Sequence, residues 1–302
     1  MPNREHPSLS EILASAVAIA RGAGAILREG LATVEAQRGT AVQFKTTDID
    51  PVTEYDVRSE RYIVGELQRL FPGHRIIGEE GGDYSIENPL AAAPDHTWYV
   101  DPQDGGSERR GQARPSEYTW YIDPLDGTVN FSHGFPYFCV SMGMLVDGVP
   151  SVGVIYNPIA DHMYAAARGN GATRNGMPMR ISTTVELRRA LVITGFPYDT
   201  HIHDSNMRNF LGFQRTAQAT RRIGSAALNL CYTAAGQMDG YWEMKTKPHD
   251  IAAGIVLVRE AGGTVTDFDG GEDMLQSCCI VASNGLIHGE MLDVVHAADD
   301  RG

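Results

Sequence analysis

The sequence predicts a mixed α/β or α+β protein that is folded as a layered sandwich. A long segment near the start carries apolar residues at helical spacing, which indicates one long helix. The middle of the chain holds strand-like segments joined by a tight turn, and the last third alternates helices and strands loosely. This order is not a regular βαβ repeat, so separate stacked layers are favoured.

The first half of the chain is predicted to begin with two helices. Ser8 and Glu11 have the spacing of a capping box at the start of a helix over 9–35. A second helix is expected over 53–70, where the Phe71-Pro72-Gly73 sequence stops it. Strands are predicted at 75–78, 119–122 and 137–145.

The second half is predicted to alternate strands with two further helices. The turn sequence Val146-Asp147-Gly148-Val149 predicts a hairpin into a strand over 151–156. Two glycines, Gly262 and Gly263, end a helix that is predicted over 251–261. The other predicted elements are strands at 163–168, 191–194, 264–268 and 279–282, and a helix over 225–235.

Composition excludes several functional classes. The 302-residue chain has a net charge of −13, which opposes nucleic acids and anionic membranes as main partners. Its four cysteines show neither CxxC nor zinc spacing, so we expect free thiols in a reducing cytoplasm. The apolar stretch Ile12–Ala20 is closely bracketed by Glu11 and Arg21, which favours a helix over a secretory signal. No apolar run approaches the roughly 20 residues that a membrane span needs.

One segment of the chain is repeated. Residues 97–107 read TWYVDPQDGGS and residues 119–129 read TWYIDPLDGTV, and seven of the eleven positions are identical. This is too short for a packed repeat unit, so we interpret 97–118 as a local tandem-duplication insert. The polar segment between the copies, SERRGQARPS over 107–116, reads as an exposed loop.

The strongest chemical signal is the run from Asp123 to Phe131, DPLDGTVNF. Two carboxylates, Asp123 and Asp126, follow a predicted strand and can converge on one point. The Gly127-Thr128 pair suits a helix start, where free N–H groups attract phosphate. An isolated DPxDG would be read as a surface turn; the length of the run favours a functional site.

Three more acidic positions support this interpretation, although each has an ordinary alternative. Glu79 follows a strand within Gly-Glu-Glu-Gly and could be a solvated surface acid. Asp250 stands at a predicted helix start and could be a simple cap. Asp56 could be an exposed acid in the first turn of its helix.

The chain resembles the inositol monophosphatase family over roughly residues 12–286. The resemblance rests on four motifs that occur in the family order: GEE, DPLDGTVNF, HDIAAG and EAGG. Asn157-Pro158 and the RGNGA run over 168–172 match as well. The resemblance implies an αβαβα layered sandwich, a lithium-sensitive hydrolase that uses two or three Mg²⁺ ions, and a homodimer. It also implies one phosphatase domain over 1–302, with sub-domains of about 1–185 and 186–290.

The resemblance also implies residue roles. It assigns a first metal to Glu79, Asp123 and the Leu125 carbonyl, and a second metal to Asp123, Asp126 and Asp250. It assigns activation of the attacking water to Thr128 and Asp56 beside Glu79. Carboxylate oxygens suit Mg²⁺, and paired ions can hold the attacking and leaving oxygens of a phosphate. The implied substrate contacts are Lys45, Gly127, Thr128, Arg221 (or Arg222), Gly224, Ser225, Ala226 and Glu243.

The chain departs from the family pattern in two places. Asp101 lies 22 residues after Glu79, which is the family spacing, whereas Asp123 lies 44 residues after it. We nevertheless expect the second copy to form the site, because it carries Thr128 where the first copy has Gly106. The second departure is His249, where many relatives carry Trp; we expect it to change packing beside the site.

The leading hypothesis is therefore a Mg²⁺-dependent phosphomonoesterase acting on a small polyol phosphate, with inositol-1-phosphate first. Histidinol phosphate and fructose-1,6-bisphosphate are the alternatives. A nucleotide 3′-phosphatase is disfavoured, because such relatives carry Lys after DGT where this chain has Val129. A different class, a non-enzymatic regulator that kept the fold, is favoured only by the insert. Nucleic-acid binding is opposed by the net charge.

Overall fold

The computed structural model describes residues 7–36, 43–44, 51–84, 118–197 and 205–299. The first copy of the repeat and Lys45 lie outside these described residues. The predictions that involve them, including the roles of Asp101 and Asp104, are therefore carried forward as predictions.

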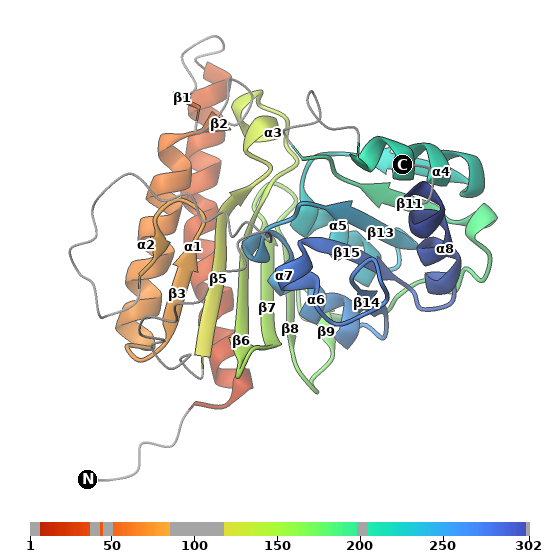
Figure 1. Ribbon diagram of the computed structural model, residues 1–302. Coiled ribbons are helices and arrows are strands. Elements are labelled where there is room, and N and C mark those ends of the chain that lie inside the picture. Colours follow the sequence, from red (N-terminus) through yellow and green to blue (C-terminus); the bar gives the residue numbers. More distant parts are fainter. Residues whose placement is uncertain (1–6, 37–42, 45–50, 85–117, 198–204, 300–302) are drawn as a thin grey trace, which may run out of the picture.

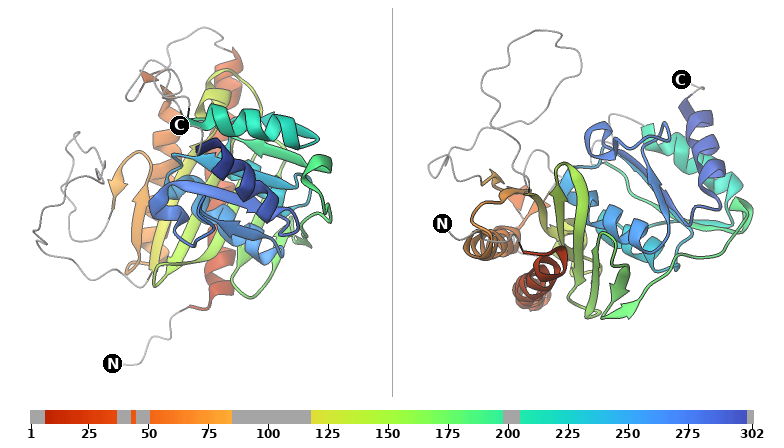
Figure 2. Two further views of the ribbon diagram at one scale, coloured as in Figure 1. Left: turned by 45° about the vertical axis from the view of Figure 1, so that its right-hand side comes forward. Right: turned by 90° about the horizontal axis from the view of Figure 1, so that it is seen from below.

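Five layers of helices and sheets build the molecule (Figures 1 and 2). Helices α1 (Leu9–Ala36) and α2 (Glu54–Leu70) cover the outer face of an eight-stranded sheet. Helices α5 (Ala226–Ala234) and α6 (Pro248–Glu260) fill the space between that sheet and a five-stranded one. Helices α4 (Ser205–Thr216) and α8 (His288–Asp299) cover the far side. The predicted αβαβα sandwich is confirmed.

The first sheet has the strand order β10-β9-β8-β7-β6-β5-β3-β4. Strands β3 and β5 are parallel, and all other neighbours in this sheet are antiparallel. The strands are β3 (Arg75–Gly78), β4 (Gly82–Asp83), β5 (Tyr118–Asp126), β6 (Cys139–Val146), β7 (Val149–Asn157), β8 (His162–Ala167), β9 (Ala172–Arg174) and β10 (Met177–Pro178).

The second sheet has the order β12-β11-β13-β15-β14 and is mixed, with β11 parallel to both of its neighbours. Its strands are β11 (Leu191–Thr194), β12 (Ala219–Arg222), β13 (Gly240–Met244), β14 (Thr264–Thr266) and β15 (Cys279–Ser283). The remaining elements are β1 (Gln43–Phe44), β2 (Pro51–Val52), α3 (Thr128–Ser132), the 3₁₀ turn Leu187–Arg189 and α7 (Met274–Ser277). The sub-domain boundary predicted near 185 falls between the two sheets.

The two N-terminal helices begin as their sequences predict. Ser8 Oγ accepts from the Glu11 N–H, and Glu11 accepts in return from the Ser8 N–H, which is a capping box. By length and composition α1 could cross a membrane, but its apolar face packs in the protein core, where Ile12 and Leu27 are fully buried. Thr53 caps α2 in the same way, with Asp56 as its partner.

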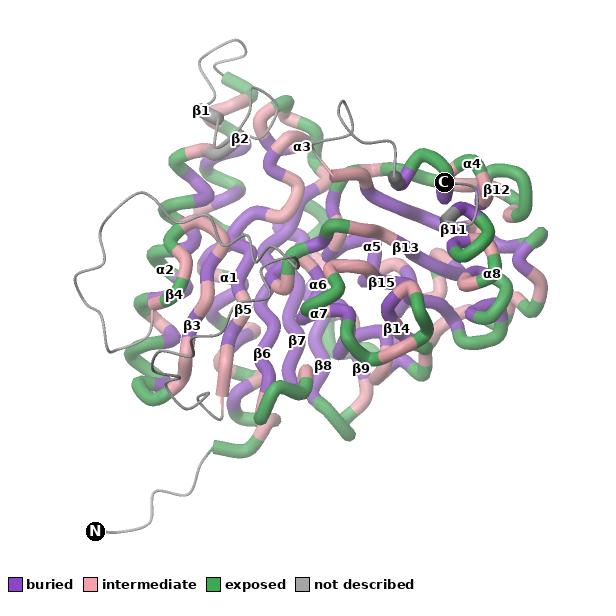
Figure 3. Tube along the Cα trace, in the orientation of Figure 1, coloured by how far each residue is buried: buried purple, intermediate pink, exposed green. Residues whose placement is uncertain are grey.

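Helix α6 is buried on all sides because it lies between the two sheets (Figure 3). Two glycines let it approach the first sheet closely. A Cβ atom at Gly143 of β6 would lie 2.6 Å from the Ala253 nitrogen, and one at Gly153 of β7 would lie 2.3 Å from the Ala253 oxygen. The two glycines therefore allow α6 to lie close to β6 and β7 at Ala253.

Several predicted boundaries need correction. The strand predicted over 137–145 begins at Cys139, and the strand predicted over 119–122 continues to Asp126. The helix predicted over 251–261 begins at Pro248, so Asp250 lies inside its first turn. The helix start predicted at Gly127-Thr128 is the start of α3. Elements α4, α7, α8, β4, β9, β10, β12 and β13 were not predicted individually.

Candidate metal centre

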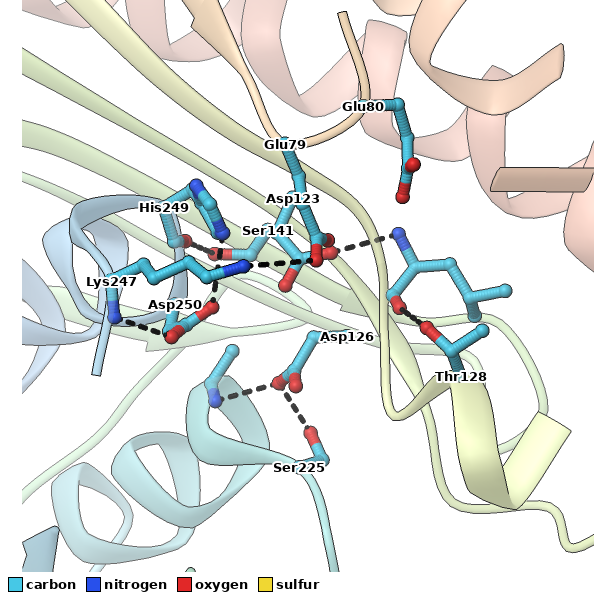
Figure 4. Close-up of polar contacts among 12 residues, drawn as sticks. Glu79, Glu80, Asp123, Asp126, Thr128, Ser141, Ser225, Lys247, His249 and Asp250 are labelled. Atoms are coloured by element: carbon cyan, nitrogen blue, oxygen red, sulfur yellow. Dashed lines mark hydrogen bonds and ion pairs between the residues drawn. The ribbon is translucent and has the colours of Figure 1, made fainter. Parts of the chain in front are cut away.

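Asp123 and Asp126 lie at the end of β5, where the strand is irregular. Residues three apart in a regular strand point to opposite faces. Here Asp123 pairs with Ser141 of β6 and Asp126 pairs with Cys139. Between these two pairs, β5 therefore contains one residue more than β6. This bulge turns the second carboxylate toward the side of the first, as Figure 4 shows. The convergence predicted from DPLD therefore has a structural cause.

Glu79 reaches the same place from the neighbouring strand. Strands β3 and β5 are parallel, so their carboxyl ends meet at one edge of the sheet. The Glu79 N–H donates to the Ile122 carbonyl at 3.1 Å, which extends the pairing one residue beyond β3. The side chain of Glu79 then points toward Asp123 (Figure 4).

Asp250 completes the group from the third residue of α6. Its Oδ2 accepts from the Lys247 N–H at 2.7 Å, which fixes the carboxylate against the helix start. The Lys247 ammonium, on a side chain that is 59% exposed, lies 4.0 Å from Glu79 Oε1. One lysine therefore offsets only part of the charge of four acidic side chains.

Burial and mutual repulsion of the carboxylates favour a bound cation at this cluster. Burial raises the pKa of Asp126, and the negative charges of Asp250 and Glu79 raise it further. Burial raises the pKa of Asp250 too, and Glu79 again adds to the effect. Carboxylates that resist ionisation in this way gain most from a bound cation, since its charge removes their repulsion.

The donor set fits Mg²⁺, which prefers hard oxygen ligands. Four carboxylates border one region (Figure 4). The Leu125 carbonyl lies beside Thr128, whose Oγ1 is 2.9 Å from it. Within the described residues, no three acidic, His or Cys side chains converge tightly enough to enclose an ion unaided. Because Mg²⁺ retains several waters and substrate oxygens as ligands, an open arrangement of carboxylates suits it.

Asp126 is held by α5, a contact that the sequence did not reveal. Its Oδ2 accepts from Ser225 Oγ at 2.6 Å and from the Ala227 N–H at 2.7 Å. Asp123 likewise accepts from the Leu125 N–H at 3.0 Å. Local N–H and O–H donors therefore orient both carboxylates.

Thr128 and Asp56 meet beside the carboxylates. Thr128 Oγ1 lies 3.2 Å from Asp56 Oδ1 and 2.9 Å from the Leu125 carbonyl, so its single proton has two acceptors within reach. Asp56 is fully buried, and its other oxygen accepts from the N–H and hydroxyl of Thr53. The capping box of α2 therefore fixes the carboxylate that faces Thr128. The alternative interpretation of Asp56, as an exposed acid in the first turn of its helix, is therefore wrong.

The predicted substrate residues lie around this cluster in different ways. Gly127 has φ +100, and a Cβ there would lie 2.9 Å from the Tyr137 carbonyl, so the turn requires glycine. Gly224 has φ +90 and lies against Asn130, whose amide donates to the Ile223 carbonyl. Ser225 is 2% exposed and uses its hydroxyl on Asp126, which is a positioning role.

The two neighbouring arginines, Arg221 and Arg222, contact different groups. The Arg221 guanidinium donates to the neighbouring Thr220 carbonyl. Arg222 instead lies 4.9 Å from the Phe196 ring centre, and its charge acts on Glu243. The geometry therefore directs Arg222 toward Glu243, while the assignment of Arg221 to the substrate stays a prediction.

Comparison with known proteins assigns the family. The model of the inositol monophosphatase family matches residues 8–108 and 106–299. The chain belongs to the inositol monophosphatase family. The two matched stretches overlap at residues 106–108, at the end of the first copy, so each stretch contains one whole copy of the repeat.

Relatives of this phosphatase-family chain carry two kinds of name. It is 39% identical over 258 residues to an inositol-1-monophosphatase of Synechocystis, covering 85% of this chain and 80% of that protein. It is 35% identical over 290 residues to a putative Nus factor SuhB of Neisseria meningitidis, covering 96% and 99%.

Solved structures agree on the fold. The inositol monophosphatase of Anabaena superposes with a TM-score of 0.77 at 36% identity, covering 96% of each chain. The suppressor protein SuhB of Bartonella henselae gives a TM-score of 0.80 at 32% identity, covering 94% of this chain and 98% of that one. The family is generally Mg²⁺-dependent, in agreement with the donor set described above.

Glu60 holds the turn that follows Glu79. The sequence analysis did not identify this residue. It is 1% exposed, and its carboxylate accepts from the N–H groups of Glu80 and Gly81 and from the Tyr84 hydroxyl, at 2.7–2.9 Å. A Cβ at Gly78 would lie 2.4 Å from Glu60 Oε2, so the glycine makes room for it.

We expect Glu60→Gln to lower stability by about 1–3 kcal/mol, because an amide cannot accept all three donors. The displaced turn should also raise the Mg²⁺ concentration needed for half-maximal activity. Denaturant unfolding and a Mg²⁺ titration measure the two effects. Tyr84→Phe removes one donor and is the milder control. An unchanged Mg²⁺ requirement in Glu60→Gln would contradict the positioning role.

Glu243 predicts a pH dependence of stability. Burial raises its pKa to about 8, with Tyr241 Oη donating to it at 2.7 Å. The folded metal-free protein then binds more protons than the unfolded chain between about pH 4.5 and 8, so stability falls as pH rises through this window. We expect a loss on the order of 1–3 kcal/mol. Unfolding at pH 6 and 8 tests this. Glu243→Gln should flatten the dependence, and an equal slope in both proteins would contradict the assignment.

Proposed function

We propose that this chain is a Mg²⁺-dependent phosphomonoesterase that hydrolyses a small polyol phosphate, with inositol-1-phosphate as the first candidate. The observation that carries the proposal is the gathering of Glu79, Asp123, Asp126 and Asp250 from β3, β5 and α6 around one region (Figure 4). The inositol-1-monophosphatase names among its relatives support the choice of substrate.

The proposed ligands divide into two overlapping sets. Glu79, Asp123 and the Leu125 carbonyl would hold one ion, and Asp123, Asp126 and Asp250 would hold a second. Bound Mg²⁺ supplies positive charge that stabilises the phosphate oxygens and lowers the pKa of an attacking water. The chain contributes rigid positions for these oxygens, through the β5 bulge and the donors from α5.

Thr128 and Asp56 are proposed to orient the attacking water. When Thr128 donates its proton to Asp56 Oδ1, its oxygen is left to accept a hydrogen bond from that water. Asp56 stays in place because Thr53 holds its second oxygen. The pair therefore acts as a hydrogen-bonded relay toward a buried carboxylate.

The polyol would be bound opposite the carboxylates, near Glu243, Gly224 and Ala226. Burial raises the pKa of Glu243 to about 8 in the metal-free chain, which favours the protonated form that can donate as well as accept. A group of this kind suits a substrate rich in hydroxyls. Lys45, Gly127 and Arg221 stay in the proposal as phosphate or polyol contacts.

A phosphate-release assay tests the function. The panel is inositol-1-phosphate, histidinol phosphate, fructose-1,6-bisphosphate and adenosine 3′,5′-bisphosphate, each with Mg²⁺, with added Li⁺, and after chelation. We expect the highest kcat/KM for inositol-1-phosphate, inhibition by Li⁺ and loss of turnover on chelation. A different preferred ester would replace the substrate, and full turnover after chelation would contradict the metal mechanism.

A second candidate is a regulator that acts through binding, because several relatives are named Nus factor SuhB. The net charge of −13 opposes direct contact with RNA, so a protein partner is the form this candidate takes. Absence of turnover on every ester of the panel, with metal binding intact, would favour it. The phosphatase proposal also includes a homodimer and a cytoplasmic location. The cytoplasmic location is consistent with the four free thiols.

A further inference from the structure

His249 has an unexplained nitrogen beside the proposed metal centre. The residue precedes Asp250 in the first turn of α6 and is 8% exposed. Its carbonyl accepts from Ser141 Oγ of β6 at 3.4 Å, which holds the turn against the first sheet. Its Nε2 is buried and has no hydrogen-bond partner. A buried polar atom without a hydrogen bond lowers stability unless something binds it.

This nitrogen lies 3.4 Å from Oδ1 of Asp250, which makes an ion pair only if the imidazole is protonated. The other oxygen of Asp250 is already used, since it accepts from the Lys247 N–H. Nε2 and Oδ1 therefore face each other, and Figure 4 shows the imidazole directed toward the carboxylate from the same helix turn. Ligands of one first-row ion, each bound at about 2.0–2.2 Å, are separated by about 3 Å or slightly more.

We propose that Nε2 of His249 is a ligand when the Asp250 site holds a transition-metal ion in place of Mg²⁺. The inference rests on the proposed function, and it revises our expectation that His249 only alters packing. A nitrogen donor changes the chemistry of the site, because imidazole suits Co²⁺, Ni²⁺ and Zn²⁺, whereas Mg²⁺ is served by oxygen alone. Relatives with Trp at this position would lack the donor.

Mn²⁺ is the probe for a direct test, because its unpaired electrons report on coordinated nitrogen. We expect pulsed electron paramagnetic resonance of Mn²⁺ added to the metal-free full chain to show coupling to an imidazole nitrogen. The coupling should disappear in His249→Gln and in His249→Trp, the second variant in case the first does not fold. His133→Gln, at an exposed histidine after α3, should keep it.

The outcomes separate this inference from the proposed function. Mn²⁺ that binds without nitrogen coupling would overturn the role of His249 and leave the carboxylate site intact. Coupling that persists in both His249 variants would overturn it as well. Failure of the wild-type chain to bind Mn²⁺ would overturn both proposals.

Metal selectivity gives an independent readout. Calorimetric titration of His249→Gln should show Co²⁺ binding weakened by about tenfold or more, the size of effect expected for lost support at a metal. Mg²⁺ binding should change by less than about twofold, since Mg²⁺ gains little from nitrogen. Equal losses for the two ions would show a purely structural imidazole and contradict the proposal.

Discussion

Asp123→Asn and Asp250→Asn are each expected to reduce phosphate release by at least about 10³-fold, through loss of charge stabilisation at the phosphate. Neither change should unfold the protein. Asparagine keeps a side-chain oxygen that can accept from the Leu125 N–H or the Lys247 N–H, respectively. The metal-free variants should unfold at the same temperature as the wild type or higher, because repulsion among the carboxylates falls.

Thermal unfolding with and without Mg²⁺ completes this test. The wild-type unfolding temperature should rise with Mg²⁺, since a ligand that binds the folded state stabilises it, and that of the variants should rise less. Asp239→Asn is the matched control. Asp239 is 8% exposed and accepts from the Leu191 N–H at 2.7 Å, but it precedes β13 in the second sheet. It should keep its activity; wild-type turnover by Asp123→Asn would place the site elsewhere.

The two copies of the repeat should differ completely in their effect on activity. Asp126→Asn should abolish turnover, because Asp126 lies with the other carboxylates and is held by Ser225 and Ala227. Asp101→Asn combined with Asp104→Asn should leave kcat near normal. Only the second copy has a threonine hydroxyl, Thr128, beside the proposed attacking water. The phosphate-release assay on the two variants measures this contrast.

Deletion of residues 97–118 extends the same test. The family model matches this chain in two stretches that overlap at residues 106–108, at the end of the first copy. The interpretation of 97–118 as an insert stays a prediction. We expect the shortened chain to fold and to keep its activity, because surface insertions cost little loop entropy. Loss of activity in the Asp101/Asp104 variant with retention in Asp126→Asn would mean that the first copy forms the site.

Most of the carboxylate site could be predicted because its signals are local. Asp123 and Asp126 belong to one short run, and Glu79 follows a strand that pairs with β5, so chain direction alone brings them together. The same locality explains why Asp56 and Thr53 could be placed at the start of a helix. Helical spacing at one end of the chain and paired strands in the middle predicted a layered sandwich, and the family resemblance supplied its αβαβα order.

The missed features depend on contacts between distant parts of the chain. Ser225 and Asp126 are 99 residues apart, and no pattern in either segment indicates that one donates to the other. Glu60 acts through the backbone of residues 80 and 81, where side-chain identity carries no signal. Strand β13 has five residues without regular alternation and owes its place to pairing with β11 and β15. Tertiary packing decides such segments more than local preference does.

Crystals soaked in Mn²⁺ and examined by anomalous diffraction test the central claim most directly. The account predicts anomalous peaks between Glu79, Asp123, Asp126 and Asp250, with the Leu125 carbonyl among the contacts. Oxygen–metal distances near 2.1–2.2 Å would be expected for such ligands. Absence of a peak among these four carboxylates, or a peak bound by Asp101 in their place, would contradict the account.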